Sequence, residues 1–166
     1  MEAARFEVGL SRCIAQQGDF GGKAEVTLNV FFDSSALAKR YIEEKGSDQV
    51  QAILSSASAL AVSVICIPEI VSALCRRRRE RKVSTQAYRN VKASVLSDID
   101  DATVIGITEE VIAQAVALLE QFPLRSADAL HVACASEWST DLFVSADDRQ
   151  CAAARAHGLR VEAIRV

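Results

Sequence analysis

Short apolar runs alternate with segments of helical pattern along most of this chain. The runs are rich in β-branched and aromatic residues and are short enough for buried strands. They span residues 26–32, 61–67, 102–107, 142–145 and 159–164. Strands that are apolar on both faces and are connected through helices are typical of a parallel sheet with helices on both sides. The sequence therefore predicts an α/β fold with a central, mostly parallel sheet.

Polar residues and glycines mark where the intervening helices begin and end. Ser34 is expected to cap a helix that ends at Gly46, and Ser126 to cap a helix over residues 127–138. Further helices are expected over residues 48–56, from Pro68, from Ser84, from Thr108 to Phe122, and from Asp148 to a stop at Gly158. Helices therefore connect each apolar run to the next.

The length of 166 residues suits one domain with a sizeable core. Residues 1–25 contain three glycines after position 17 and no clear periodicity, so we expect a flexible extension there and a single domain over residues 26–166. No apolar stretch approaches the roughly 20 residues of a membrane helix, and we expect no secretory signal. A soluble, cytoplasmic protein is the expectation.

The five cysteines are widely spread, and no Cys-x-x-Cys pair exists. The chain has only two histidines, so the short local spacings of a zinc site are absent. We therefore interpret the cysteines as small buried apolar groups.

Four acidic residues follow or flank the predicted strands. Asp33 directly follows the first strand, Glu69 lies two residues past the second, and Asp147 comes just after the fourth. Asp128 lies in the first turn of the helix that precedes the fourth strand. Ligands of open parallel sheets collect outside the carboxyl ends of the strands. We therefore expect these four residues, called the acidic quartet below, to converge on one end of the sheet.

Four converging carboxylates need a compensating cation, because two of them about 4 Å apart repel by about 4 kcal/mol at an effective dielectric constant of about 20. Oxygen ligands favour Mg²⁺ or Mn²⁺ over zinc or copper, and such an ion can activate water for attack on a phosphodiester. Each acid alone has a simpler explanation, since an aspartate after a strand is often a turn former or a helix cap. The joint pattern predicts a metal-dependent nuclease.

Four segments resemble the acidic motifs of the PIN domain family. They are FFDSSALAKRY, IPEIVSAL, RSADALHVACA and FVSADDRQCAAARAHGL, in the family's order, and the resemblance covers about residues 26–166. It implies a three-layer α/β/α sandwich and a nuclease that uses Mg²⁺ or Mn²⁺. It also implies that Asp33, Glu69, Asp128 and Asp147 form the family's acidic site, with Ser145 as a supporting hydroxyl.

PIN domains of this length and motif style are commonly the ribonuclease toxins of VapBC-type toxin–antitoxin pairs. The resemblance therefore implies an RNA substrate, an antitoxin protein as partner, and a homodimer. The extension over residues 1–25 departs from the compact toxins, which usually begin just before the first strand. Ser34 and Ser35 can cap a helix or support Asp33, and capping is the favoured interpretation.

The segment RRRRERK, called the basic segment below, spans residues 76–82 and carries a charge of +5 in a chain of net charge −3. Subtracting +5 from −3 leaves −8 on the rest of the chain. On one helix, Arg77, Arg78, Arg81 and Lys82 would form a stripe. This stripe can bind RNA phosphates or an acidic partner peptide; alternatively, the segment is a solvated helix end whose cations suit the helix dipole.

His131 lies three residues after Asp128 and so near the same helix face. A satisfied core histidine is the favoured interpretation, and contact with substrate is the alternative. Aromatic residues are few, at 5% of the chain, which favours an enzyme that handles phosphates over a module that stacks RNA bases.

The preferred hypothesis is a PIN-type endoribonuclease in which Asp33, Asp128 and Asp147 ligate the ion and Glu69 binds it directly or through water. A phosphatase of the haloacid dehalogenase type would need a second aspartate two residues after the first, and this chain has Ser35 there. A catalytically silent PIN-like module that binds protein or RNA, and a non-toxin PIN nuclease that processes RNA, stay open as alternatives.

Overall fold

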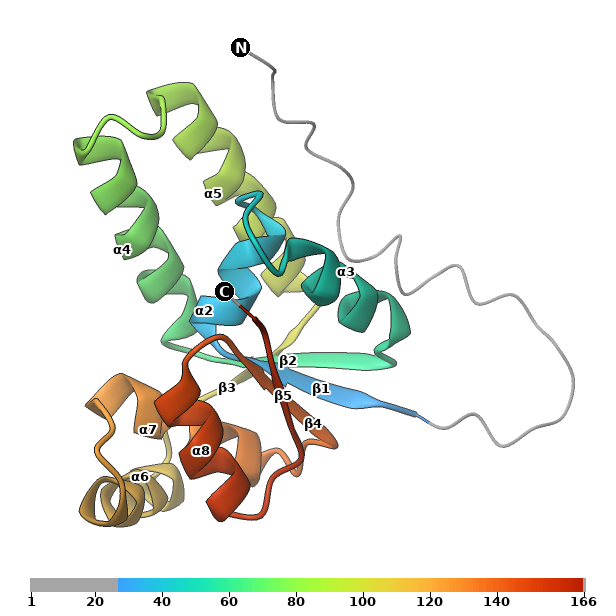
Figure 1. The fold of residues 1–166 in the computed structure, drawn as a ribbon, viewed down its shortest axis with the longest axis vertical. Coiled ribbons are helices and arrows are strands. Elements are labelled where there is room, and N and C mark those ends of the chain that lie inside the picture. Colours follow the sequence, from blue (N-terminus) through green and yellow to red (C-terminus); the bar gives the residue numbers. More distant parts are fainter. Residues whose placement is uncertain (1–26, 166) are drawn as a thin grey trace, which may run out of the picture.

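A parallel sheet of five strands forms the centre of the described structure (Figure 1). The computed structural model describes residues 27–165, so the predicted extension over residues 1–25 lies outside the described residues. The strands lie in the order β3-β2-β1-β4-β5, and each neighbouring pair is parallel. Their bounds are β1 Asn29–Phe32, β2 Ala59–Ser63, β3 Thr103–Ile105, β4 Leu142–Ser145 and β5 Val161–Ala163. The predicted α/β class and parallel sheet are confirmed.

Helices cover both faces of the sheet and complete three layers (Figure 1). One face carries α2 (Ser34–Leu37), the short 3-10 helix η1 (Ala38–Arg40), α3 (Ser47–Ser56), α4 (Cys66–Arg79) and α5 (Thr85–Asp100). The other face carries α6 (Glu109–Gln121), α7 (Ser126–Glu137) and α8 (Asp148–Ala156). The α/β/α sandwich implied by the resemblance is therefore confirmed.

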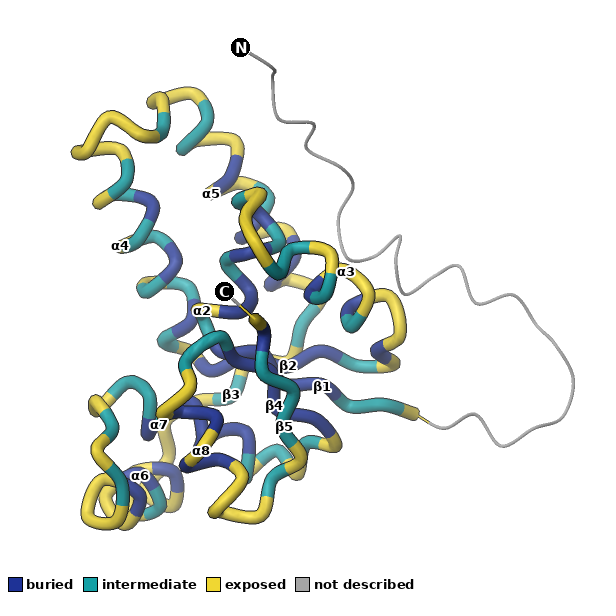
Figure 2. The backbone as a smooth tube through the Cα atoms, in the orientation of Figure 1, coloured by how far each residue is buried: buried dark blue, intermediate teal, exposed yellow. Residues whose placement is uncertain are grey.

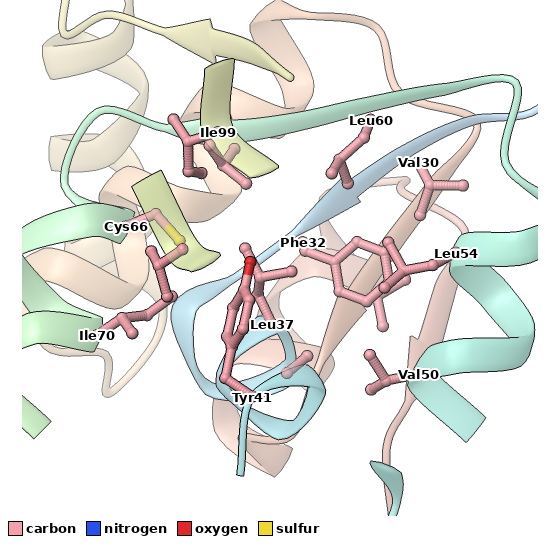
Figure 3. Packing of buried hydrophobic residues seen from close by; sticks show 14 of the residues in the cluster. Val30, Phe32, Leu37, Tyr41, Val50, Leu54, Leu60, Cys66, Ile70 and Ile99 are labelled. Atoms are coloured by element: carbon pink, nitrogen blue, oxygen red, sulfur yellow. The ribbon is translucent and has the colours of Figure 1, made fainter. Parts of the chain in front are cut away.

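Successive residues of a strand point to opposite sides of the sheet, so each strand contributes apolar side chains to both buried faces. Val30 and Phe32 of β1 pack with α2 to α5 (Figure 3), whereas Phe31 packs with α6 to α8. The ring of Phe31 stacks on that of Phe143 in β4, with the two centroids 5.9 Å apart. Figure 2 shows the central strands as buried along most of their length. Burial on both faces explains why these strands are continuous apolar runs in the sequence.

Two predicted boundaries of the first helix are wrong. Asp33, not Ser34, caps α2, because the Oδ1 atom of Asp33 accepts a hydrogen bond from the Ala36 N–H at 2.8 Å. The helix ends at Leu37 and continues only as η1, well before Gly46. Gly46 instead precedes α3, with a φ of 95°. Aspartate and serine cap helices almost equally well, so the sequence did not separate the two positions.

The second strand also ends earlier than expected. It spans Ala59–Ser63, and α4 already begins at Cys66, inside the apolar run expected to be strand. Cys66 is buried in the core and Ile67 is partly buried against it, and an apolar run alone does not distinguish a buried strand from a buried helix. The first, third and last strands are shorter than predicted, whereas β4 has the predicted bounds.

Three helix starts agree with the sequence. The hydroxyl of Ser84 caps α5 and that of Thr108 caps α6, each accepting a hydrogen bond from a backbone N–H three residues later. The helix α8 begins at Asp148, and Gly158 follows its end with a φ of 94°.

The four cysteines among the described residues are free thiols, and Cys66, Cys134 and Cys151 are buried as predicted, whereas Cys75 is only partly buried. Cys13 lies outside the described residues. Within residues 27–165, no helix combines the length and apolar character needed to cross a membrane.

Gly46 and Gly158 allow a matched test of the fold. Both have φ near +95°, but a Cβ at Gly46 would lie 2.5 Å from the Ile164 Cγ2 atom and 2.9 Å from the Arg165 carbonyl oxygen. A Cβ at Gly158 would meet nothing within 4 Å. We expect Gly158→Ala to lower the free energy of unfolding by about 1–2 kcal/mol through backbone strain. Gly46→Ala should cost about 2–5 kcal/mol, because overpacking adds to the strain. Urea denaturation measures both losses, and equal losses would contradict the close approach at Gly46.

Candidate active site

Three buried polar residues lie side by side where the central strands end. Continuing the register of the strand pairs places Asp33, after β1, beside Ser63 of β2 and Ser145 of β4. All three are at most 3% exposed. By strand alternation they share the side of Phe31, Ala61 and Phe143, which pack against α6 to α8. The carboxyl ends of the strands therefore present polar groups to the layer that contains α7.

Asp33 is surrounded by hydrogen-bond donors. The Ala36 N–H donates to Oδ1, and the hydroxyls of Ser35 and Ser145 lie 2.7 Å and 3.1 Å from Oδ2. Burial raises the pKa of the Asp33 carboxyl above its ordinary value, while the charge of His131 and these donors oppose the rise. Within the described residues, no lysine or arginine forms an ion pair with Asp33. A nearby cation would therefore stabilise the buried anion.

Ser145 connects Asp33 to Asp147. The Ser145 hydroxyl donates to Asp33 Oδ2 and accepts a hydrogen bond from the Asp147 N–H at 3.0 Å. Asp147 caps α8, and its Oδ1 atom accepts from the N–H groups of Arg149 at 2.8 Å and Gln150 at 3.1 Å. The Ser35 hydroxyl adds a second link, because it accepts from the Ala146 N–H at 3.0 Å. Ser145 and Ser35 thus both lie between Asp33 and the segment of Asp147, so Ser35 supports Asp33 and the favoured interpretation of Ser35 as a helix cap is wrong.

Asp128 lies in the first turn of α7 and is partly buried. Its Oδ2 atom accepts a hydrogen bond from the Arg125 N–H at 3.1 Å. Arg125, not the predicted Ser126, occupies the N-cap position of this helix. The buried side chain of Gln150 donates to the backbone carbonyl of Asp128 at 3.3 Å. Gln150 therefore ties the start of α7 to the start of α8, next to Asp147.

Glu69 lies in the first turn of α4, with its side chain 37% exposed. Its Oε2 atom is 2.7 Å from the Nε2 atom of His131 and also accepts a hydrogen bond from the Ser34 hydroxyl. The hydrogen bond with His131 is the main cause that lowers the pKa of the Glu69 carboxyl. The other ring nitrogen of His131, Nδ1, lies 2.8 Å from the Ser63 hydroxyl.

The segments of all four quartet members are therefore joined by intervening side chains at one end of the sheet. Ser145, Gln150 and His131 supply the links. As the side chains lie, no group of three or more acidic, histidine or cysteine residues among residues 27–165 is close enough to hold a metal ion. The chemistry of the quartet fits Mg²⁺ or Mn²⁺, because all four side chains offer carboxylate oxygens and buried Asp33 forms no ion pair with any described residue.

Sequence reasoning missed part of this arrangement. His131 is a satisfied buried histidine, as favoured, but one of its partners is Glu69, a member of the quartet. The spacing from Asp128 predicted that His131 lies near the acidic quartet, and it contacts Glu69. No sequence signal indicated Ser63, Gln150 or the contact between Ser34 and Glu69, because these pairs are separated by 22 to 68 positions.

A family model of the PIN domain matches residues 30–156. The chain belongs to the PIN domain family. The matched range contains the whole acidic quartet and Ser145. Family membership supports the prediction of a nuclease, which the quartet had suggested. Among curated proteins, no relative matches the chain significantly.

Solved structures share the fold of this PIN domain at low sequence identity. VapC20 from Mycobacterium tuberculosis, named as a toxin that cleaves the sarcin–ricin loop, has a TM-score of 0.59 and 18% identity, covering 78% of this chain and 95% of its own. VapBC2 from Rickettsia felis, bound to promoter DNA, has a TM-score of 0.60 and 10% identity, with coverages of 82% and 98%. DNA-bound VapBC from Salmonella typhimurium has a TM-score of 0.59 and 14% identity, with coverages of 84% and 100%. At these identities the likeness concerns the fold alone.

The basic segment of this PIN domain lies at the far end of the pair formed by α4 and α5, which projects beyond the sheet (Figure 1). Figure 2 shows that this end is exposed. The single helical stripe predicted there is wrong, because α4 ends at Arg79 and Arg81 has a left-handed φ of 57°. The chain turns at this point toward the start of α5, so Arg81 and Lys82 cannot continue the helix.

The four basic residues predicted to bind RNA or a partner have different surroundings. Arg77 pairs with Glu44 at 3.0 Å, and Lys82 pairs with Glu80 at 2.8 Å. The guanidinium of Arg78 lies over the ring of Tyr88, 4.7 Å from its centroid. Arg81 is exposed, as are the neighbouring residues Arg76 and Arg79. The exposed cations of the segment are therefore available to an anionic ligand.

Proposed function

We propose that this PIN domain is a Mg²⁺- or Mn²⁺-dependent endoribonuclease and the toxin of a toxin–antitoxin pair. The proposal rests above all on the acidic quartet, whose four segments are joined at the carboxyl ends of the central strands. The buried carboxylate of Asp33, with three neutral donors around it, supports a site that takes a cation. Family membership agrees with this chemistry.

In this proposal, Asp33, Asp128 and Asp147 hold the ion, and Glu69 binds it directly or through water. When bound, the ion lowers the pKa of a water molecule and stabilises charge on the phosphodiester. Ser35 and Ser145 hold the Asp33 carboxylate in place through hydrogen bonds to Oδ2. No serine, cysteine or histidine nucleophile is required.

The toxin assignment and the RNA substrate come from relatives of the same fold. VapC20 is named as a toxin that cleaves the sarcin–ricin loop, and other matching structures are named as toxin–antitoxin or VapBC complexes. A protein antitoxin is therefore the proposed partner of this chain. The homodimer and the cytoplasmic location, both expected from the sequence, stay predictions. A silent binding module and a non-toxin RNA-processing nuclease are the alternatives.

Asparagine variants test the role of the quartet in cleavage. Asp33→Asn and Asp147→Asn should lower the rate of Mn²⁺-dependent cleavage of labelled single-stranded RNA by at least about 100-fold, because the metal supplies several kcal/mol of transition-state stabilisation. Asparagine also caps helices well, so both variants should keep the fold. EDTA should abolish cleavage by the wild-type chain.

Asp148→Asn is the matched control for Asp147→Asn. Asp148 is the adjacent acid, but it is exposed and lines a separate pocket with Lys45 and Arg165. This variant should cleave at close to the wild-type rate. Wild-type cleavage by the Asp33 or Asp147 variant would show that the quartet is not the active site.

We further propose that the basic segment contacts RNA phosphates. From Glu69 to Arg79, α4 rises by about 15 Å, so one RNA strand can reach both the quartet and the exposed arginines. In the non-cleaving Asp33→Asn chain, adding Arg79→Gln and Arg81→Gln should reduce the slope of log Kd against log salt by about 0.7 for each phosphate that is no longer bound.

Arg155→Gln, at the last turn of α8, is the control for this charge removal, because Arg155 is also exposed but lies on another layer. It should leave the slope unchanged. An unchanged slope in the double arginine variant would contradict the RNA role and favour a solvated helix end.

A further inference from the structure

The imidazole of His131 connects two elements that are far apart in the sequence. It is 2% exposed and lies on α7, one turn after Asp128. Its Nδ1 atom is 2.8 Å from the hydroxyl of Ser63 at the end of β2, and its Nε2 atom is 2.7 Å from Oε2 of Glu69 on α4. Both ring nitrogens are therefore engaged, and the ring is held between the sheet and the quartet.

The direction of these hydrogen bonds follows from the partners. An ionised carboxylate only accepts hydrogen bonds, so the proton between His131 and Glu69 belongs to Nε2. The Ser34 hydroxyl donates to the same carboxylate oxygen, Oε2, and lies 2.8 Å from Nε2. Two donors thus converge on one oxygen of Glu69, while Oε1 has no hydrogen bond among the described residues.

Glu69 needs such support more than the other acids of the quartet. Its side chain is 37% exposed and has one more rotatable bond than an aspartate, so ordering it costs more conformational entropy. The ring of His131, by contrast, is buried in a closely packed part of α7, between Ala129 and Ala135, where every residue from 131 to 135 is buried. A rigid donor on α7 therefore limits the orientations of a more mobile carboxylate on α4.

We propose that His131 is a positioning residue, which holds Glu69 through Oε2 and leaves Oε1 for the metal ion. The inference rests on the proposed function, since it assumes that Glu69 belongs to the metal site. Outer partners that orient ligands typically contribute about 10–100-fold to metal affinity. Removing the donor at Nε2 should thus weaken Mn²⁺ binding without removing a ligand.

Two amide variants separate this role from simple core packing. In His131→Gln the side-chain amide can occupy the place of Nε2 and donate to Glu69, but it no longer reaches Ser63. In His131→Asn the shorter amide can take the place of Nδ1 and bind Ser63, but it cannot reach Glu69. Both variants remove the buried ring and so weaken the packing, asparagine by one methylene group more than glutamine. They differ in which hydrogen bond survives.

The experiment measures the Kd of Mn²⁺ by calorimetry, with thermal denaturation of the metal-free chain as the check on folding. We expect His131→Asn to raise the Kd at least about tenfold and His131→Gln to stay within about threefold of wild type. His157→Asn, at the exposed histidine after α8, is the control and should leave the Kd unchanged. Equal Kd values for the Asn and Gln variants would overturn the positioning role.

Ser63→Ala gives a second test, which removes a single oxygen atom and keeps the rest of the core in place. Without its Nδ1 partner, the ring of His131 is less firmly oriented, so the Kd should rise by about twofold to threefold, as in His131→Gln, which loses the same hydrogen bond. An unchanged Kd would count against the proposal. A wild-type chain that binds no Mn²⁺ would overturn the metal site itself. Wild-type binding with no difference among the variants would overturn only the role of His131.

Discussion

The parallel alignment of the strands gathers the residues of the candidate site at one end of the sheet. Because β1, β2 and β4 run in the same direction and in register, Asp33, Ser63 and Ser145 end up next to each other and are all buried. Their side chains point to the layer of α7, which contributes Asp128 and His131. In an antiparallel sheet, neighbouring strands would end at opposite ends of the sheet and these residues would be separated. The direction of the strands is thus the constraint on which the site depends.

The N-termini of three helices supply backbone N–H groups that donate hydrogen bonds to acids of the site. Asp33 and Asp147 each cap the helix that follows their strand, and Asp128 accepts from the backbone N–H just before α7. A carboxylate at a helix N-terminus is favoured by the helix dipole. The same hydrogen bonds that begin the helices therefore hold three of the four acids, and Glu69, which has no such bond, relies on side chains.

Much of the fold could be predicted from the sequence, because burial on both faces leaves continuous apolar runs that alternate with helical segments, a pattern typical of a covered parallel sheet. The four acids were found for a related reason, since each stands next to a strand or a helix start. Ser63 and Gln150 could not be found in this way. Their roles depend on contacts with His131 and Asp128 across 68 and 22 positions, and those contacts exist only after the layers pack. The end of α4 at Arg79 was also missed, because arginine is a good helix former and gives no stop signal.

The central claim is that the four carboxylates bind one hard cation together. Diffraction from crystals grown with Mn²⁺, recorded at the manganese absorption edge, tests it most directly. We expect an anomalous peak among Asp33, Asp128 and Asp147, with oxygen ligands at about 2.1 Å and Glu69 as a direct or water-mediated ligand. An anomalous peak elsewhere, or none at a saturating Mn²⁺ concentration, would contradict it.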